Sequence, residues 1–89
     1  MDAKKYEEKL VSISIASSFF TTCMIRFQET KCGLPIVTAL QFWAKDGISH
    51  LNMIKEMSKD AYERIYALYE NEITEMQDFI DEWKGKAAG

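Results

Sequence analysis

One segment near the N-terminus, Leu10 to Ile25, runs for sixteen residues without a charged side chain. The remainder of the chain is rich in charged residues. The apolar surface of this segment therefore has to be buried, either in a bilayer, against an apolar ligand or against other polypeptide. Crossing a hydrocarbon core takes about 20 apolar residues, more than the segment supplies. Six of its residues are also hydroxylic, namely Ser12, Ser14, Ser17, Ser18, Thr21 and Thr22. Burial between protein helices is therefore favoured over a membrane span, since Ser and Thr can bond the preceding helical turn.

The apolar residues around this segment recur at alternating spacings of three and four, which predicts a helix from about Ala3 to Lys31. The repeat consists of Tyr6, Leu10, Ile13, Ser17, Phe20, Met24 and Phe27. Gly33 is a favoured stop for this helix, and Pro35 suits the first turn of the next one. Residues 32–35 are accordingly expected to form a tight turn.

The same spacing continues through a second arm, expected over about 36–84, with one inserted step before Tyr69. Its repeating positions are Leu40, Trp43, Gly47, Leu51, Ile54, Ser58, Ala61, Ile65, Tyr69, Ile73, Met76, Ile80 and Trp83. A kink at 45–48, around Gly47, would divide the arm and give three helices. Without this kink, the second arm is longer than the first, and part of its apolar stripe has no partner within the chain. We favour packing of this unpaired part against another copy of the chain. Residues 1–84 are expected to form a single helical domain, with 85–89 as a flexible tail.

These patterns predict an all-α protein: a long helical hairpin that assembles into an oligomeric helical bundle. On a helical wheel the first helix is apolar on two sides, and one neighbouring arm can cover only one of them. The dense apolar face consists of Ile13, Ala16, Phe20, Cys23, Met24 and Phe27, and the second apolar patch consists of Ile15 and Phe19, flanked by Val11. We therefore expect a homo-oligomer, most simply a dimer, in which Phe20→Asp dissociates or unfolds the assembly. The expected interface residues are Ile13, Ile15, Phe19, Phe20, Met24, Phe27, Leu51, Ile54, Ile65, Tyr69, Ile73 and Ile80.

Charge is distributed unevenly and limits the choice of partner. Residues 65–89 carry two basic and six acidic side chains, and no basic cluster elsewhere offsets them. Nucleic acid is therefore excluded as a partner, whereas another protein could dock on the acidic C-terminal arm. The segment from Asp2 to Lys9 has mixed charge rather than the basic start of a signal peptide, and Cys23 and Cys32 are too far apart on one helix to form a disulfide. We expect a cytoplasmic protein.

Few side chains suggest chemistry. His50 is the only histidine; we identify no ligand partner for it and expect a structural role. Cys23 lies on the dense apolar face and is expected to pack as a small hydrophobe. Cys32, beside Lys31, is the better candidate for a reactive thiol, but no acidic residue is placed to orient a Cys–His pair. We expect no catalytic site and no enzymatic activity.

A row of acidic residues and a group of aromatic residues are the remaining candidates. The acidic row, Glu72, Glu75, Asp78 and Asp81, is interpreted as a solvated flank, because hard cations need oxygens from several elements. No metal and no cofactor are predicted. Aromatic side chains are expected to fill the core, although they could instead line a pocket for an apolar small ligand; they include Phe42, Trp43, Tyr62, Tyr66, Tyr69, Phe79 and Trp83.

Three functions fit the sequence. The first is a non-enzymatic helical module for oligomerisation and protein interaction, with a structural or adaptor role. The second is an amphipathic protein that coats a lipid or hydrophobic granule surface. The third is a bundle that binds an apolar ligand.

Overall fold

The protein is all-α, as the sequence predicts. The computed structural model describes residues 3–33 and 36–88, and within these ranges it contains four helices and no strand. They are α1 (Ala3–Cys32), α2 (Val37–Met57), α3 (Lys59–Leu68) and α4 (Glu70–Ala88). The expected stop for the first helix, Gly33, lies just after α1 and donates its N–H to the Glu29 carbonyl at 3.0 Å. Pro35, expected in the turn, lies outside the described residues.

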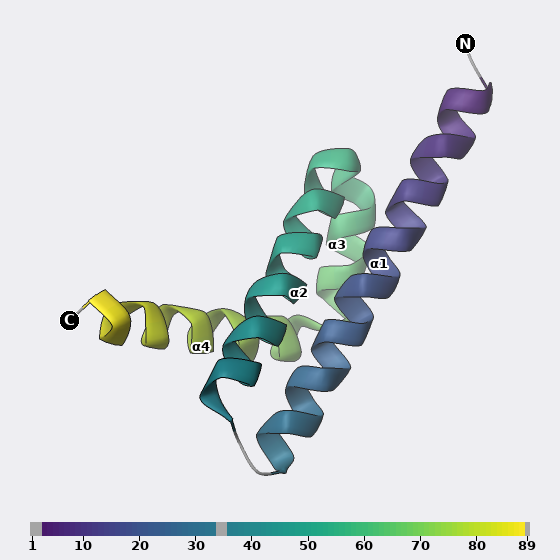
Figure 1. Cartoon of the computed structure of the whole chain (residues 1–89). Coiled ribbons are helices and arrows are strands. Elements are labelled where there is room, and N and C mark those ends of the chain that lie inside the picture. The colour runs from purple at the N-terminus through teal and green to yellow at the C-terminus, as the bar shows by residue number, and fades with distance from the viewer. Residues whose placement is uncertain (1–2, 34–35, 89) are drawn as a thin grey trace.

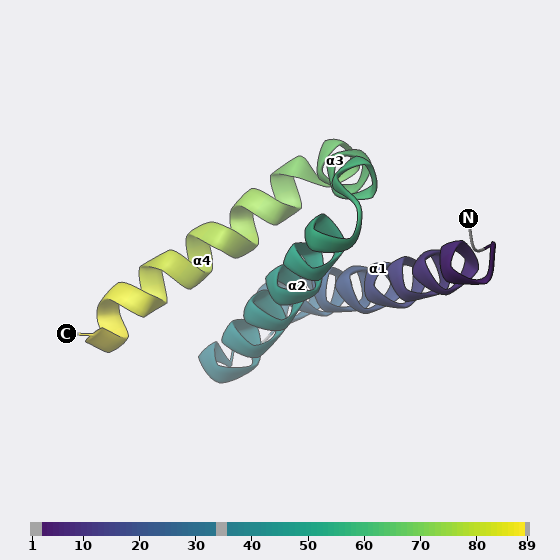
Figure 2. The same cartoon turned by 90° about the horizontal axis from the view of Figure 1, so that it is seen from above.

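The helices form an open arrangement rather than a closed bundle. Figure 1 shows α1 and α2 running side by side in opposite directions, with α3 behind α2. Helix α4 then runs away from α1, and its C-terminal half extends past the other helices (Figures 1 and 2). At the other side of the molecule, the N-terminal part of α1 also projects beyond its neighbours.

The core lies where α1, α2 and α4 meet. Helix α1 contributes the face bearing Ala16, Phe20, Cys23, Met24 and Phe27, all buried. These residues match the dense apolar face expected from the helical wheel, except that Ile13 is only half-buried. From the other helices the core receives Leu40, Ala44, Leu51, Ile54, Ile73 and Met76. Phe27 and Phe79 meet edge to face, with ring centroids 5.6 Å apart.

The second arm is not one helix. It breaks first at Ser58, whose extended backbone (φ −159°, ψ 110°) ends α2. The Ser58 hydroxyl accepts a hydrogen bond from the Ala61 N–H at 3.2 Å, which caps the start of α3. Asp60 in the first turn of α3 adds a favourable interaction with the helix dipole. Ser58, expected on a continuous seam, is therefore a helix cap.

The second break is at Tyr69, where the sequence predicts one inserted step in the repeat. Tyr69 leaves helical geometry (φ −125°, ψ 31°) between α3 and α4. Its N–H still bonds the Ile65 carbonyl, and its own carbonyl accepts from Ile73. The hydrogen bonds thus continue across a change in direction of the helix axis.

Helix α2 continues through Gly47, where the sequence left a kink open. Gly47 lies inside α2 and is buried. A Cβ atom at this position would be 2.5 Å from Met76 Cε, the end of a flexible side chain, and 3.1 Å from Cys23 Cβ. Glycine at this position therefore lets α1 approach the α2 backbone closely.

The ends of the chain differ in part from the sequence expectations. Both arms have an overhang, since the N-terminal part of α1 and the C-terminal half of α4 each extend past the other helices (Figures 1 and 2). Tyr6 and Leu10, predicted on the packed seam, are exposed. Within the expected flexible tail, 85–89, the residues up to Ala88 belong to α4.

Candidate functional site

The outer face of α1 is apolar and uncovered. Val11, Ile15 and Phe19 follow one another at spacings of four and expose 57%, 53% and 53% of their surface. Ile15 and Phe19 line a shallow groove of about 240 Å³ together with the small side chains of Ser14, Ser18 and Thr22. We refer to the set Val11, Ser14, Ile15, Ser18, Phe19 and Thr22 as the α1 outer face. Its apolar members, Val11, Ile15 and Phe19, are the second apolar patch of the first helix that the sequence predicts.

The predicted interface residues separate into three groups. Phe20, Met24, Phe27, Leu51, Ile54 and Ile73 are buried within a single chain, so the structure places them in its own core rather than between chains. A second group is half-buried at the edges of that core, consisting of Ile13, Ile65, Tyr69 and Ile80. Only Ile15 and Phe19 are exposed.

The molecule as a whole exposes more surface than a compact chain of its size. Its accessible area is 6264 Å², whereas a compact monomer of 10.3 kDa exposes about 5,400 Å² by the usual scaling. The radius of gyration is 14.6 Å, against about 12 Å for a compact domain of this length. The excess area is close to the roughly 800 Å² that each partner buries in a standard protein interface.

Charged side chains lie at both ends of the α1 outer face. Glu8 precedes Val11 by three residues, and Arg26 follows Thr22 by four, so both lie on the same side of the helix. Arg26 also pairs with Glu29, with 3.3 Å between Nη1 and Oε2, in a solvent-exposed position. The apolar part of the face thus has Glu8, within a segment of mixed charge, near one end and Arg26 near the other.

A polar cluster lies beside this face, between α1 and α2. The Cys23 thiol donates to Asp46 Oδ2 at 3.2 Å. His50 Nδ1 lies 2.7 Å from the Asp46 carbonyl oxygen and 3.8 Å from Asp46 Oδ1. One ligand atom from each of the three residues lies within 4.8 Å of the others. The Phe19 ring stacks on the His50 ring, with centroids 5.1 Å apart and 23° between the planes.

Sequence reasoning missed this cluster, although it contained a signal. Asp46 precedes His50 by four residues, so both lie on one face of α2. The partner from α1 could not be found from the sequence, because it depends on how the two helices pair. Cys23 is buried as expected, but it donates a hydrogen bond rather than packing only as a hydrophobe.

The cluster is not arranged for nucleophilic catalysis. Burial raises the pKa of the Cys23 thiol to about 12, and the hydrogen bond to Asp46 and the charge of that carboxylate add to the effect. A cysteine nucleophile needs the opposite shift and a histidine as its base. In this cluster the Cys23 thiol instead donates its hydrogen bond to the Asp46 carboxylate. Cys32, the better of the two candidates for a reactive thiol, is exposed at the end of α1.

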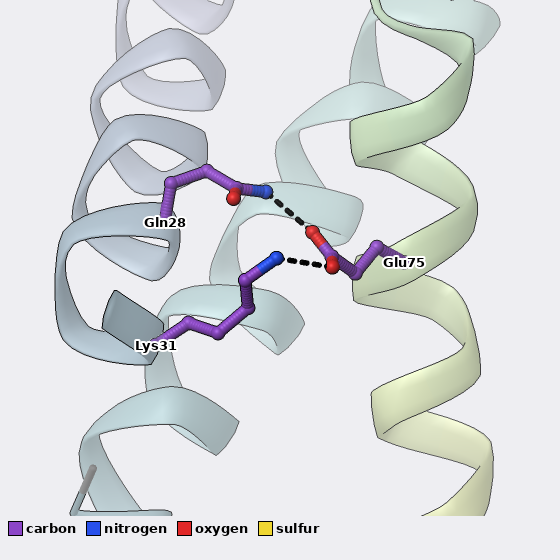
Figure 3. Close-up of polar contacts among 3 residues, drawn as sticks. All are labelled: Gln28, Lys31 and Glu75. Atoms are coloured by element: carbon purple, nitrogen blue, oxygen red, sulfur yellow. Dashed lines mark hydrogen bonds and ion pairs between the residues drawn. The ribbon is translucent and has the colours of Figure 1, made fainter. Parts of the chain in front are cut away.

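The acidic row on α4 does not converge on a cation. Glu75 instead accepts hydrogen bonds from Gln28, at 2.6 Å, and from Lys31, which tie α4 to α1 (Figure 3). Hydrogen bonding to Lys31 lowers the pKa of the Glu75 carboxyl. Among the residues that the structure describes, the one group of three or more potential ligands within coordinating reach is the Cys23–Asp46–His50 cluster.

The aromatic residues are dispersed rather than gathered around one ligand site. Phe42 and Trp43 contact each other edge to face, with centroids 4.9 Å apart. Tyr62 and Tyr66 line a separate groove of about 310 Å³ between α2, α3 and α4.

By length and composition alone, α1 is long and apolar enough to cross a bilayer, although the sequence segment 10–25 by itself is shorter than a span. Only 28% of the most apolar window of α1 is buried in the fold, whereas a core helix of a soluble protein that meets the same criterion is mostly buried; a signal sequence near an N-terminus also meets it. Comparison with family models, curated proteins and solved structures finds no match to this chain.

Proposed function

We propose that the chain is a non-enzymatic self-association module, in which two copies pair through the α1 outer face. The observation that carries this proposal is the row of Val11, Ile15 and Phe19, each more than half exposed on a helix that already buries its opposite side. Fully burying a side chain of this kind contributes about 1.5–3 kcal/mol, and roughly half of that remains to be gained for each.

A second copy fits this face better than an unrelated partner does. In an antiparallel pairing centred at Ser17, Ile15 lies opposite the partner's Phe19. The same register places Glu8 opposite the partner's Arg26, so that the two charged ends of the face match. The small residues Ser14 and Ser18 permit close approach of the two helices.

The solution mass tests the proposal. Light scattering should give twice the chain mass of 10.3 kDa at micromolar concentration. Phe19→Asp should give a monomer with unchanged helix content, because it places a charge in the dimer interface but outside the core. Phe42→Asp is the matched control, since Phe42 is similarly exposed on α2, and it should stay dimeric. A monomeric wild-type protein would refute the proposal.

A charge exchange tests the register. Glu8→Arg and Arg26→Glu should each weaken the dimer by placing like charges opposite each other, and the double variant should recover most of the loss. Additive weakening in the double variant would exclude the antiparallel register.

A second candidate function is the coating of a neutral hydrophobic surface, favoured by the apolar composition of α1. In sedimentation with neutral lipid vesicles, a lipid-coating protein appears in the pellet and loses its dimer mass. A self-association module stays in the supernatant as a dimer.

A further inference from the structure

We propose that Cys23, Asp46 and His50 form a binding site for a divalent transition-metal ion of the Zn²⁺ class, with water as the fourth ligand. The site does not depend on the proposed self-association, because all three residues belong to one chain. It is separate from the acidic row on α4, which the sequence pattern identifies as a solvated flank.

The spacing of the ligand atoms is close to that of a tetrahedral site. Metal–ligand distances of about 2.0–2.3 Å place neighbouring ligand atoms roughly 3.3–3.6 Å apart. In the structure, Cys23 Sγ and Asp46 Oδ2 are 3.2 Å apart, and Asp46 Oδ1 and His50 Nδ1 are 3.8 Å apart. All three ligand atoms lie within 4.8 Å. Asp46 thus directs one carboxylate oxygen to each of its two neighbours. His50 Nδ1 also lies 2.7 Å from the Asp46 carbonyl oxygen, so metal binding requires the imidazole to release that hydrogen bond and turn a deprotonated ring nitrogen toward the thiolate.

The donor set selects the class of metal. One thiol, one imidazole and one carboxylate suit Zn²⁺ and Co²⁺, which accept mixed sulfur, nitrogen and oxygen ligands. Ca²⁺ and Mg²⁺ need several oxygens, and this cluster offers a single carboxylate. Three protein ligands and an open position is also the arrangement that leaves a bound water on zinc.

The helices hold these ligands in place before any metal binds. Asp46 and His50 project from the same side of α2, four residues apart. Cys23 reaches them from α1 at the point where Gly47 allows the two helices to approach closely. The stacked Phe19 ring orients the His50 ring. A site on paired helices is more rigid than one on a loop.

Metal binding must displace a proton from the thiol. The Cys23 S–H bond breaks, a sulfur–metal bond forms, and the proton passes to solvent. The titratable groups that face Cys23 are Asp46 and His50, both from α2; from α4, the nearby side chain is the apolar Met76. Because binding releases this proton, the apparent affinity for the metal should rise with pH.

Titration with Co²⁺ alone, under reducing conditions, tests the site. We expect one Co²⁺ per chain, with the absorption bands of a tetrahedral ion and a thiolate-to-cobalt charge-transfer band. Zn²⁺ should compete for the site and remove the colour. Cys23→Ala should abolish the charge-transfer band, whereas Cys32→Ser, at the other cysteine, should leave it unchanged.

Asp46→Asn and His50→Ala should each weaken Co²⁺ binding by tenfold or more. Both residues are partly exposed, so these variants remain informative even if Cys23→Ala fails to fold, which far-UV circular dichroism will show. The proposal is overturned if saturating Co²⁺ gives no thiolate band, if the band depends on Cys32, or if neither Asp46→Asn nor His50→Ala changes the affinity.

Discussion

At the scale of single residues, Gly47, where the sequence left a helix break open, is instead a position of close contact between helices. Replacing it with alanine should improve helix propensity by about 1 kcal/mol. The added methyl would collide with Met76 Cε, 2.5 Å away, and press on Cys23 Cβ. Overpacking of a core costs about 1–3 kcal/mol. We expect Gly47→Ala to lower the free energy of unfolding by about 1 kcal/mol net in urea denaturation.

A double-mutant cycle isolates the cause of that loss. Met76→Leu removes the Cε atom while nearly conserving volume, so Gly47→Ala should be neutral or stabilising in that background. If alanine costs the same in both backgrounds, then Met76 is not the obstacle. Sequence reasoning could not anticipate this contact, because the atoms in conflict belong to different helices.

Glu75 predicts a stability change in the acid range. Its folded-state pKa is lowered, chiefly by the hydrogen bond to Lys31, so its stabilising effect is present above the unfolded-state pKa of about 4.3. That effect is lost as the pH falls through the lowered folded-state pKa. The pKa of Lys31 is raised, so its own contribution is lost only in strong alkali. We expect Glu75→Gln to melt below wild type at pH 7.

The difference in melting temperature between wild type and Glu75→Gln should shrink below pH 4. It should vanish once Glu75 of the wild type is protonated, because the side chain at position 75 is then neutral in both proteins. Asp81→Asn is the matched control, because Asp81 is exposed further along α4 and bonds only within that helix. A gap that persists undiminished in acid would mean that the ion pair with Lys31 is not its source.

At the scale of the helices, the apolar repeat correctly predicted an all-α chain. It did not predict where the second arm folds back. The repeat placed Ser58 on a continuous seam, and the structure uses its hydroxyl as a cap for α3. Serine followed two residues later by Asp60 is a recognisable helix start. The period alone did not reveal it, because the three-and-four spacing of apolar residues runs unbroken across the turn.

The cap makes a direct prediction. Ser58→Ala should lower the free energy of unfolding by about 1 kcal/mol, because the Ala61 N–H loses its partner at the start of α3. Ser49→Ala is the control, since Ser49 is exposed within α2 and alanine is the better helix former there. Urea denaturation of both variants compares the two. Equal effects would mean that Ser58 does not act as a cap.

At the scale of the whole molecule, the two apolar sides of α1 were predictable from its helical wheel. Which side packs into the core of the chain and which side stays exposed was not. The number of neighbours that one chain can supply depends on its folded topology. Because the second arm folds into three short helices, it covers one side of α1 with its own core and leaves the other side open. The residues predicted to join two chains are therefore mostly those that hold one chain together, and Phe19 and Phe20 exemplify the difference.

These neighbouring phenylalanines give the sharpest test at this scale. Phe20 is fully buried, so Phe20→Asp places an unpaired charge in the core and should unfold the chain at every protein concentration, with a loss of more than about 4 kcal/mol. Phe19→Asp alters a half-exposed side chain and should leave a folded monomer. Circular dichroism and light scattering on both variants, over a range of concentrations, separate folding from association. If Phe20→Asp is folded but monomeric, then the core described for the single chain is instead formed between chains.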